Sequence, residues 1–422
     1  MHVLSLAAAL FVQDGAAAQA PEEAAAAAPV SEFAVNLFER LPASLETWEP
    51  EGFEAAVAMQ AFAMAGREDL IARFEPGAFT YPDCPMREDE ALDTVIEAAR
   101  EAQIVIVNEA HDQPFHRHVI EQIGLALSAE FDVFAAETFN YLRLMGEREP
   151  GALGWYDNEP VFARQVAALE EAGYRFVAYE IRAHQRDPDL EDRAERIALR
   201  EEAQANNLIA EVLEDDPDAR ILIHVGYSHV LEAPQPRGEG EAPLTWFAAR
   251  LKDKTGIDPL TISQTHCSPA APEDSGGSQE DDAAAEAGAE AEGEPAGTDS
   301  DPPEPVVAPG ALVLADGADA APDGAIDLFL AHGPITFTDH RPDWRRAAGD
   351  IAVAIPETLQ AQDGPVIVEA RAPDETLAHA PADRVLVYPG ETPVLLLPQG
   401  EWVATAWDGD GQVGAAVEVA AR

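Results

Sequence analysis

Four runs of β-branched and aromatic residues in this chain of 422 residues each lead into a histidine or a glutamate. The runs are IVIVNEAH (104–111), FDVFAAET (131–138), RFVAYE (175–180) and ILIHVGYSH (221–229). Short continuous apolar runs are typical of buried parallel strands, and open α/β sheets bind ligands beyond the carboxyl ends of their strands. We therefore expect the four run ends to converge on one cleft and to form an active site.

The segments between these runs have helical patterns. Asp112 is placed to cap a helix that has Pro114 in its first turn. Residues 191–213 carry apolar side chains at helical spacing, and a fifth strand is expected at 260–263. Alternating strands and helices predict βαβ units, that is, an α/β fold with a mainly parallel sheet flanked by helices.

The composition changes twice in the second half of the chain. Residues 268–305 are rich in Ala, Glu, Asp, Gly, Ser and Pro, which predicts an acidic disordered insertion. Short apolar runs separated by Pro, Gly and Asp follow at 350–422 and predict a small all-β, sandwich-like accessory domain. The α/β domain should span 31–267, and residues 306–345 would complete it if the chain returns there.

The first 20 residues have a short apolar stretch followed by small residues, although no basic residue precedes the stretch. This pattern indicates a signal peptide and hence a periplasmic or secreted protein. No other apolar run approaches the roughly 20 residues needed to cross a bilayer, so we expect no stable membrane insertion. The two cysteines, Cys84 and Cys267, would form one disulfide in an exported protein or remain as free thiols.

Acidic residues outnumber basic residues by 79 to 26, and Lys252 and Lys254 are the two lysines. A net charge of -53 repels nucleic acid and anionic membranes, so neither is an expected partner. We interpret the charge as adaptation to a salty medium plus one acidic linker, with cation buffering as the alternative. A small-molecule or peptide substrate is the partner we expect, and the sequence indicates no particular oligomeric state.

The sequence NEAHDQPFHR, at 108–117, places Glu109 and His111 in a turn between a strand and a helix. Histidine suits proton transfer near neutral pH and also binds metals, and a helix N-terminus favours anions. We predict catalytic roles for Glu109 and His111, and substrate binding by His116 and Arg117.

Glu137 and Glu180 each follow a strand buried on both faces, where an unpaired carboxylate is costly. One is predicted to be a base or metal ligand and the other to orient a histidine. Arg200 would bind a substrate anion or neutralise both acids in a structural salt bridge.

His229 is the remaining predicted catalytic residue. Gly226 is expected to allow a tight turn that points His229 back across the strand ends, whereas His224 is expected in the core.

Taken in order, HDQPFHR from His111, AAET at Glu137, YE at Glu180, the helix with Arg200 and the closing GYSH resemble one superfamily. It joins erythromycin esterase-like proteins, ChaN-like haem-binding uptake proteins and the Tiki/TraB/PrgY proteins. The resemblance covers about residues 95–265, with an extension to 345. Its paired G-x-x-H pattern is complete at 226–229, whereas Asn108 stands at the first glycine position.

The resemblance implies three functions. The first is hydrolysis of an ester or peptide-like bond by water, since no G-x-S-x-G nucleophile motif occurs. Similarity to the Tiki branch implies a divalent metal (Mn, Co or Zn) held by His111, Glu137 and His229, whereas the esterase branch implies that histidine and glutamates suffice. The second function is binding of haem, with His116, Tyr141 or Tyr227 as axial ligand. The third is an inactive interaction module.

Overall fold

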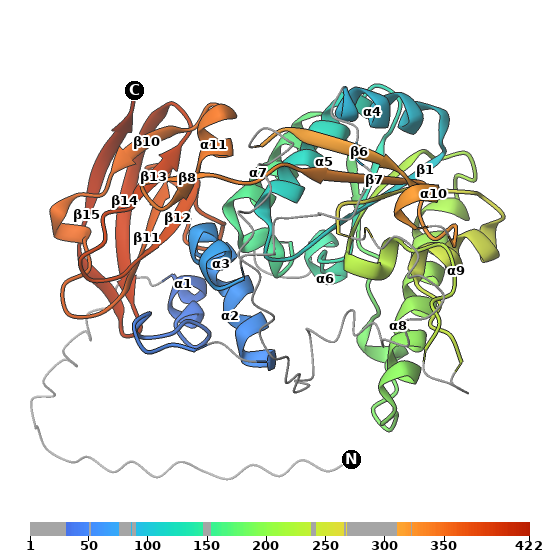
Figure 1. Ribbon diagram of the computed structural model, residues 1–422, viewed down its shortest axis with the longest axis horizontal. Helices are drawn as coiled ribbons and strands as arrows, with labels where there is room; N and C mark the ends of the chain where they lie inside the picture. The colour runs from blue at the N-terminus through green and yellow to red at the C-terminus, as the bar shows by residue number, and fades with distance from the viewer. Residues whose placement is uncertain are drawn as a thin grey trace, which may run out of the picture.

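The computed structural model describes residues 31–49, 52–75, 86, 90–146, 153–237, 242–265, 267, 310–321 and 323–422. Its larger part is a seven-stranded sheet flanked by helices (Figure 1). The strand order is β3-β2-β4-β1-β5-β7-β6, with β6 antiparallel to β7 and the other neighbours parallel. The strands are β1 (Ile104–Glu109), β2 (Val133–Ala136), β3 (Arg175–Val177), β4 (Ile221–Gly226), β5 (Leu260–Ser263), β6 (Leu312–Asp316) and β7 (Leu328–His332). This confirms the predicted α/β fold.

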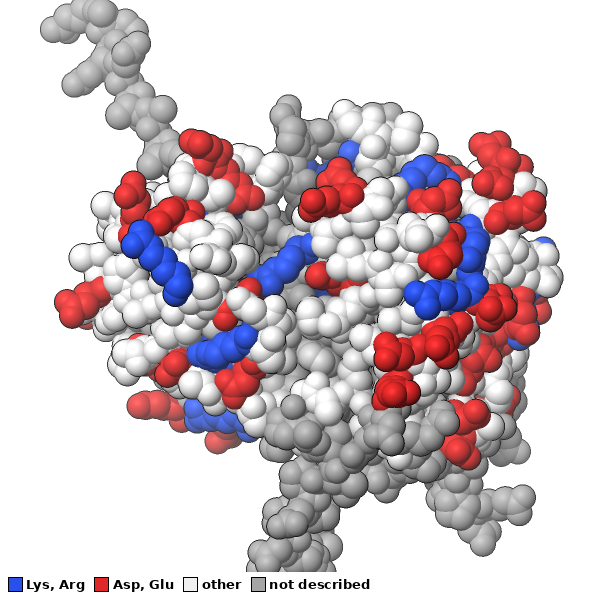
Figure 2. Space-filling model, turned by 90° about the horizontal axis from the view of Figure 1, so that it is seen from above, with Lys and Arg blue, Asp and Glu red and all other residues white. Residues whose placement is uncertain are grey.

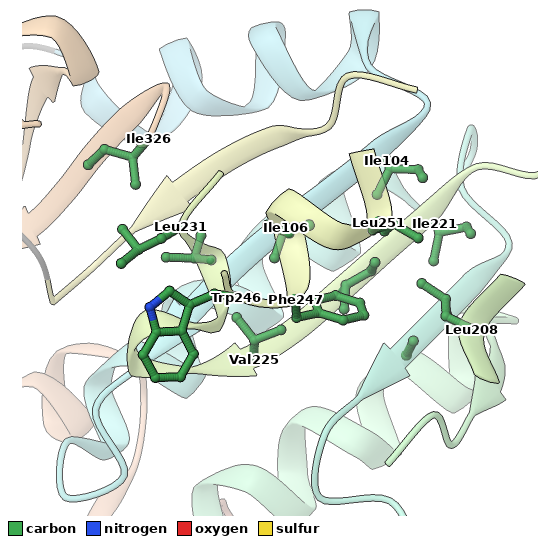
Figure 3. Close-up of a cluster of buried hydrophobic side chains, with 14 of the residues drawn as sticks. Ile104, Ile106, Leu208, Ile221, Val225, Leu231, Trp246, Phe247, Leu251 and Ile326 are labelled. Atoms are coloured by element: carbon green, nitrogen blue, oxygen red, sulfur yellow. The ribbon is translucent and has the colours of Figure 1, made fainter. Parts of the chain in front are cut away.

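Both faces of this sheet are buried under helices. In β1, Ile104 and Ile106 pack in the layer of α8 and α9, whereas Val105 and Val107 pack in the layer of α4, α5 and α7. Figure 3 shows the first layer, where α9 lies over the strands. The helices are α4 (Ala91–Glu101), α5 (Pro114–Leu127), α6 (Tyr141–Leu144), α7 (Pro160–Glu171), α8 (Arg193–Leu208), α9 (Phe247–Thr255) and α10 (Gly317–Ala320). Burial on both faces explains why the strands have continuous apolar runs.

The C-terminal part consists of antiparallel sheets, which confirms the predicted all-β region. A four-stranded sheet, in the order β12-β11-β14-β15, packs one face against the β10–β13 pair through residues such as Val368 and Leu397. The elements of this part are β8 (Phe337–Thr338), β9 (Arg341–Pro342), α11 (Asp343–Ala347), β10 (Ile351–Ala354), β11 (Val366–Arg371), β12 (Asp383–Val387), β13 (Val394–Leu397), β14 (Gly400–Asp408) and β15 (Gly411–Ala421).

The other face of the four-stranded sheet is covered by the N-terminal helices α1 (Glu32–Leu37), α2 (Gly52–Met64) and α3 (Glu68–Phe74) (Figure 1). Phe62 shares a buried cluster with Ile367 and Trp407. The sequence predicts these helices as part of the α/β domain at 31–267, but their apolar side chains pack on the C-terminal sheet. We call residues 31–75 and 337–422 together the accessory unit.

Buried ion pairs lie within the accessory unit and join it to the α/β domain. Asp383 is completely buried and accepts hydrogen bonds from Arg341 and Arg345. Arg345 also bonds Asp350, which pairs at 3.1 Å with Arg164 of α7. Ion pairs therefore contribute to the interface between the accessory unit and the α/β domain.

Several predictions concern residues outside the described ranges, namely the signal peptide at 1–20, the insertion at 268–305 and Cys84. Cys267 is disulfide-bonded. Among the described residues, no helix is long and apolar enough to span a membrane. Figure 2 shows acidic side chains spread over both units, several of them beside arginine or lysine.

Candidate active site

The parallel pairing of β1, β4 and β2 brings their carboxyl ends together. Val107 of β1 and Ala136 of β2 both align with His224 of β4, and Glu109 aligns with Gly226. The charged residues that end β1 and follow β2 therefore leave the sheet at neighbouring positions, as expected for an open α/β sheet.

His111 and Glu109 form a hydrogen-bonded pair just beyond β1. Nδ1 of His111 lies 2.9 Å from Oε1 of Glu109, whose side chain is 2% exposed. Burial alone would raise the pKa of Glu109, but Arg117, His224 and His111 hold this pKa well below its ordinary value. An ionised carboxylate only accepts hydrogen bonds, so Nδ1 of His111 carries a proton, and in the neutral ring Nε2 then has the free lone pair. No described residue hydrogen bonds to this Nε2.

Two buried side chains, those of Arg117 and His224, contact the Glu109 carboxylate. Arg117 donates from Nε at 2.7 Å to Oε2 and from Nη2 at 3.1 Å to Oε1 of Glu109. Nε2 of His224 lies 3.0 Å from the same Oε2, and its ring stacks on Phe162 at 4.9 Å. His224 is thus in the core, as expected, but it also contacts the carboxylate that orients His111.

Gly226 has no side chain, and this leaves room for the side chains of His111 and Glu137. A Cβ at this position would lie 2.5 Å from Cε1 of His111, 2.8 Å from its Nε2 and 3.2 Å from Oε2 of Glu137. Its φ of -90° is accessible to any residue, whereas the next residue, Tyr227, has φ +32°. The predicted tight turn therefore exists, but Tyr227 adopts the unusual conformation and Gly226 makes room for His111.

Asn108 lies within β1 in the extended conformation, so the missing glycine does not affect a turn. Its side chain is completely buried. Nδ2 donates to the Tyr227 carbonyl at 2.6 Å and to Oγ1 of Thr265 at 2.6 Å, while Oδ1 accepts from the Gln264 amide at 2.6 Å. Asn108 therefore joins β1 to the turn after β4 and to the end of β5.

Arg200 of α8 binds both glutamates that follow β2 and β3. It donates from Nη2 to Oε1 of Glu137, and from Nε at 3.1 Å and Nη2 at 2.6 Å to Glu180. The Gly226 amide donates to the other oxygen of Glu137 at 2.8 Å. The pKa of Glu137 is held below its ordinary value, since His229, Arg200 and His111 outweigh the opposing effect of burial. Glu137 and Glu180 are only partly buried, with side chains 16% and 25% exposed, and Arg200 is the cation that pairs with both.

His229 forms a second histidine–glutamate pair. Its Nδ1 lies 2.8 Å from Oε2 of Glu201, a completely buried carboxylate, and its Nε2 lies 3.0 Å from Nη1 of Arg200 and 3.5 Å from Oε1 of Glu137. Burial alone would lower the pKa of His229, but Glu201 and Glu137 raise it to about 9. In the neutral ring, Nε2 of His229 accepts a hydrogen bond from Nη1 of Arg200. In the protonated ring, Nε2 carries a proton, cannot accept from Arg200 and has Oε1 of Glu137 as its nearby acceptor.

Two tyrosines enclose the ring of His111. Tyr156, in the short helix η1 (Tyr156–Asn158), stacks on it with ring centroids 4.2 Å apart and planes at 18°. Tyr227, in η4 (Tyr227–Val230), meets it edge-on at 4.9 Å. The imidazole therefore has few orientations open to it.

His116 and Arg117, which were predicted to bind substrate, have no exposed surface. Nδ1 of His116 accepts a hydrogen bond from the Ala110 amide at 3.0 Å, and Arg117 binds Glu109 and Glu159. Both lie on the buried face of α5, so neither is accessible to a substrate. Burial also separates His116, a predicted haem ligand, from any cofactor at the surface.

The predicted metal ligands do not fit a metal in this arrangement. Both oxygens of Glu137 accept hydrogen bonds, and both nitrogens of His229 face partners. The Arg200 guanidinium occupies the position between Glu137 and His229 that a cation would take. No group of three or more His, Cys, Asp or Glu side chains in the described ranges is arranged to hold a metal ion.

Sequence reasoning missed four residues that shape the site, namely Glu201, His224, Tyr156 and Glu159. Glu201 follows Arg200 in α8, and Glu159 caps α7 by accepting from the amides of Val161 and Phe162 at 2.9 Å. Acid before a proline is a recognisable cap signal, but none of these positions had a signal that linked it to His111 or His229.

Comparisons with known proteins give little further information. No family model matches the chain, and no curated protein matches its sequence. A solved structure, that of the type III effector HopBA1, aligns over 44% of this chain and 88% of its own at 15% identity, with a TM-score of 0.29. A similarity this low supports no statement about a shared fold or function.

Proposed function

We propose that this protein is an exported hydrolase that uses water to cleave an ester or peptide-like bond. The observation that carries the proposal is the His111–Glu109 pair. A buried ionised carboxylate holds Nδ1 of His111, and no described residue occupies its Nε2. This is the arrangement of a general base, in which the carboxylate orients the ring and stabilises the imidazolium that forms.

In this mechanism Nε2 of His111 removes a proton from water as the water attacks the carbonyl carbon. Negative charge then develops on the carbonyl oxygen and needs a donor. Arg200 is suited to that role, because its side chain is 35% exposed and one N–H of its Nη1 has no acceptor among the described residues. The Nε and Nη2 donors of Arg200 bind Glu180 and Glu137 and hold the guanidinium in place.

The leaving group also needs a proton. His229 is suited to supply it, since Glu201 and Glu137 raise its pKa to about 9 and keep it protonated at neutral pH. The two histidines, each paired with a buried glutamate, would thus act as base and acid. The resemblance to erythromycin esterase-like proteins, where histidine and glutamates suffice, agrees with this assignment, and no step depends on a metal.

The test compares the purified wild type with His111→Gln and His229→Gln on p-nitrophenyl butyrate and on a set of lactones and peptides. The exposed His379, on the accessory unit, gives the matched control His379→Gln. We expect both site variants to lose roughly a hundredfold or more in kcat, and the control to lose nothing. Full activity in His111→Gln would contradict the proposal.

Bound elements and the visible spectrum are measured on the same samples. Stoichiometric manganese, cobalt or zinc that is lost in His111→Gln would favour the metal-dependent branch over the mechanism above. Iron with a haem absorption band, and no hydrolysis by the wild type, would favour a haem-binding protein. A wild type without hydrolysis, metal or haem would favour an inactive interaction module.

A further inference from the structure

Residues 153–159 supply two of the side chains that shape the candidate site. Tyr156 stacks on the ring of His111, and Glu159 accepts a hydrogen bond at 3.1 Å from Nη1 of Arg117. Arg117 in turn binds Glu109, the partner of His111. The position of this one segment therefore affects His111 directly, through a ring, and indirectly, through a chain of buried charges.

The segment is tied to the α/β domain at its first half. The Tyr156 amide donates to Oγ1 of Thr138 at 3.1 Å, and the Leu153 carbonyl accepts from the Asn140 amide at 2.7 Å. Gly154 fits directly against Thr138, where a Cβ would lie 1.9 Å from the Thr138 carbonyl oxygen. These contacts fix the backbone near residue 154, but they do not fix the two aromatic rings that follow.

The accessory unit contacts those rings and the end of the segment. Trp155 packs against Phe33 of α1 with ring centroids 5.0 Å apart, and the guanidinium of Arg40 lies 4.4 Å from the Trp155 ring centroid. The Tyr156 hydroxyl donates to Oε1 of Gln60 on α2 at 3.3 Å. Phe33 and Gln60 come from the N-terminal helices, and Arg40 comes from the turn after α1.

The C-terminal sheet makes the fourth contact. Nη1 of Arg384 on β12 donates to the Asn158 carbonyl at 2.9 Å and to the Met64 carbonyl, at the end of α2, at 3.1 Å. Arg384 is 1% exposed and is fixed by Glu369 at 2.8 Å. The buried guanidinium of Arg384 therefore connects the C-terminal sheet, the N-terminal helices and the segment that carries Tyr156.

We propose that the accessory unit positions the catalytic histidine, by holding residues 153–159 so that Tyr156 lies flat on His111 and Glu159 meets Arg117. The proposal rests on the hydrolase function above, and it gives the accessory unit a role in catalysis without a reacting group of its own. Tyr156, Gln60 and Arg384 are positioning residues. A displacement of about 1 Å at a reacting group is enough to cost up to roughly a hundredfold in rate.

The test uses the full chain and two readouts. The first is the NMR resonance of the His111 ring in protein labelled at histidine ¹³Cε1, identified by its loss in His111→Gln. A stacked tyrosine shifts this resonance through its ring current, so the resonance reports the position of Tyr156 whether or not the protein hydrolyses anything. The second readout is kcat and KM on p-nitrophenyl butyrate.

Phe33→Ala removes the contact with Trp155, and Gln60→Leu removes the acceptor of the Tyr156 hydroxyl. Phe53→Ala is the matched control, because Phe53 lies on α2 and is 44% exposed. We expect both test variants to move the His111 resonance and to lower kcat roughly tenfold with little change in KM, and the control to change neither. If Phe33→Ala does not fold, Gln60→Leu and Tyr156→Phe, alone and combined, provide the test, since the combination should add nothing to either.

An unmoved His111 resonance in folded Gln60→Leu and Phe33→Ala, with kcat unchanged, would overturn the positioning role. A moved resonance in a protein whose wild type hydrolyses no probe would leave the positioning of His111 supported and remove the hydrolase proposal instead. The two failures are therefore distinguishable.

Discussion

Nδ1 of His229 lies 2.8 Å from Oε2 of Glu201, a carboxylate with no exposed surface. A buried acid next to a histidine favours the protonated ring. Together with Glu137, it raises the pKa of His229 to about 9 against the opposing effect of burial. The proton of this pair links the proposed catalysis to the stability of the fold.

This link predicts how stability depends on pH. A histidine in the unfolded chain has a pKa of about 6.5, so a folded pKa near 9 stabilises the native state by about 3 kcal/mol below pH 6.5. The contribution decreases as the pH rises above 6.5 and is lost above 9, because both states are then neutral at this residue. Urea unfolding at pH 6 and pH 9.5 measures the loss.

Glu201→Gln should remove most of this alkaline loss. Glu202→Gln is the matched control, since Glu202 is 40% exposed and pairs with Arg250 and Lys254 instead. It should retain the wild-type dependence between pH 6 and 9.5. The same pH dependence in Glu201→Gln and wild type would show that Glu201 does not control the protonation of His229.

Gly226→Ala tests the space that His111 occupies. The backbone at Gly226 accepts alanine, but the new methyl group would lie 2.5 Å from the His111 ring, which must therefore move. We predict a loss of roughly a hundredfold in kcat and a shifted His111 NMR resonance. Gly364→Ala adds a methyl group where nothing lies within 4 Å and should change neither quantity. If Gly226→Ala keeps both wild-type values, the His111 ring does not depend on the space at Gly226 and the prediction is wrong.

The roles of Gly226 and Asn108 illustrate what the sequence could and could not predict. Apolar runs predicted β1, β2, β4 and β5, because strands buried on both faces need apolar residues at consecutive positions. Parallel pairing then placed the run ends together. The reason for glycine at 226 could not be predicted, because it depends on a side chain from another strand.

The same limit applies to helix faces. The first turn of α5 follows His111 closely in the chain, and nothing in the local sequence distinguishes a side chain that is exposed at the candidate site from one that faces the sheet. His116 and Arg117 face the sheet. Likewise, nothing in the local sequence of α2 indicates that its partner is a sheet more than 300 residues later in the chain. Such partners follow from tertiary packing, not from local propensity.

Asp383 should be the most sensitive position in the accessory unit. It accepts hydrogen bonds from Arg341 at 2.8 and 3.1 Å, from Arg345, and from the Leu396 amide at 2.7 Å, and it is completely buried. Asp383→Asn leaves the buried guanidinium of Arg341 without its carboxylate and leaves Arg345 with Asp350 alone, so we predict a loss of about 3 to 5 kcal/mol in the free energy of unfolding. Urea denaturation measures this loss.

Glu401→Gln provides the comparison, because the Glu401–Arg422 pair at 2.9 Å is 66% and 78% exposed. Its effect on the free energy of unfolding should stay below about 1 kcal/mol. Equal effects of the two substitutions would mean that burial does not determine the strength of these ion pairs.

Salt should stabilise the fold, because the chain has 79 acidic and only 26 basic residues, and the excess carboxylates repel one another in the compact state. The screening length falls from about 10 Å at 0.1 M salt to about 3 Å at 1 M, which weakens repulsion between surface carboxylates more than it weakens buried pairs such as Arg117–Glu109. We predict that Tm rises by roughly 5 °C or more between 0.1 M and 2 M KCl. Glycerol at the same osmolality is the control for effects other than screening, so an equal rise in glycerol, or no rise in KCl, would contradict charge repulsion as the cause.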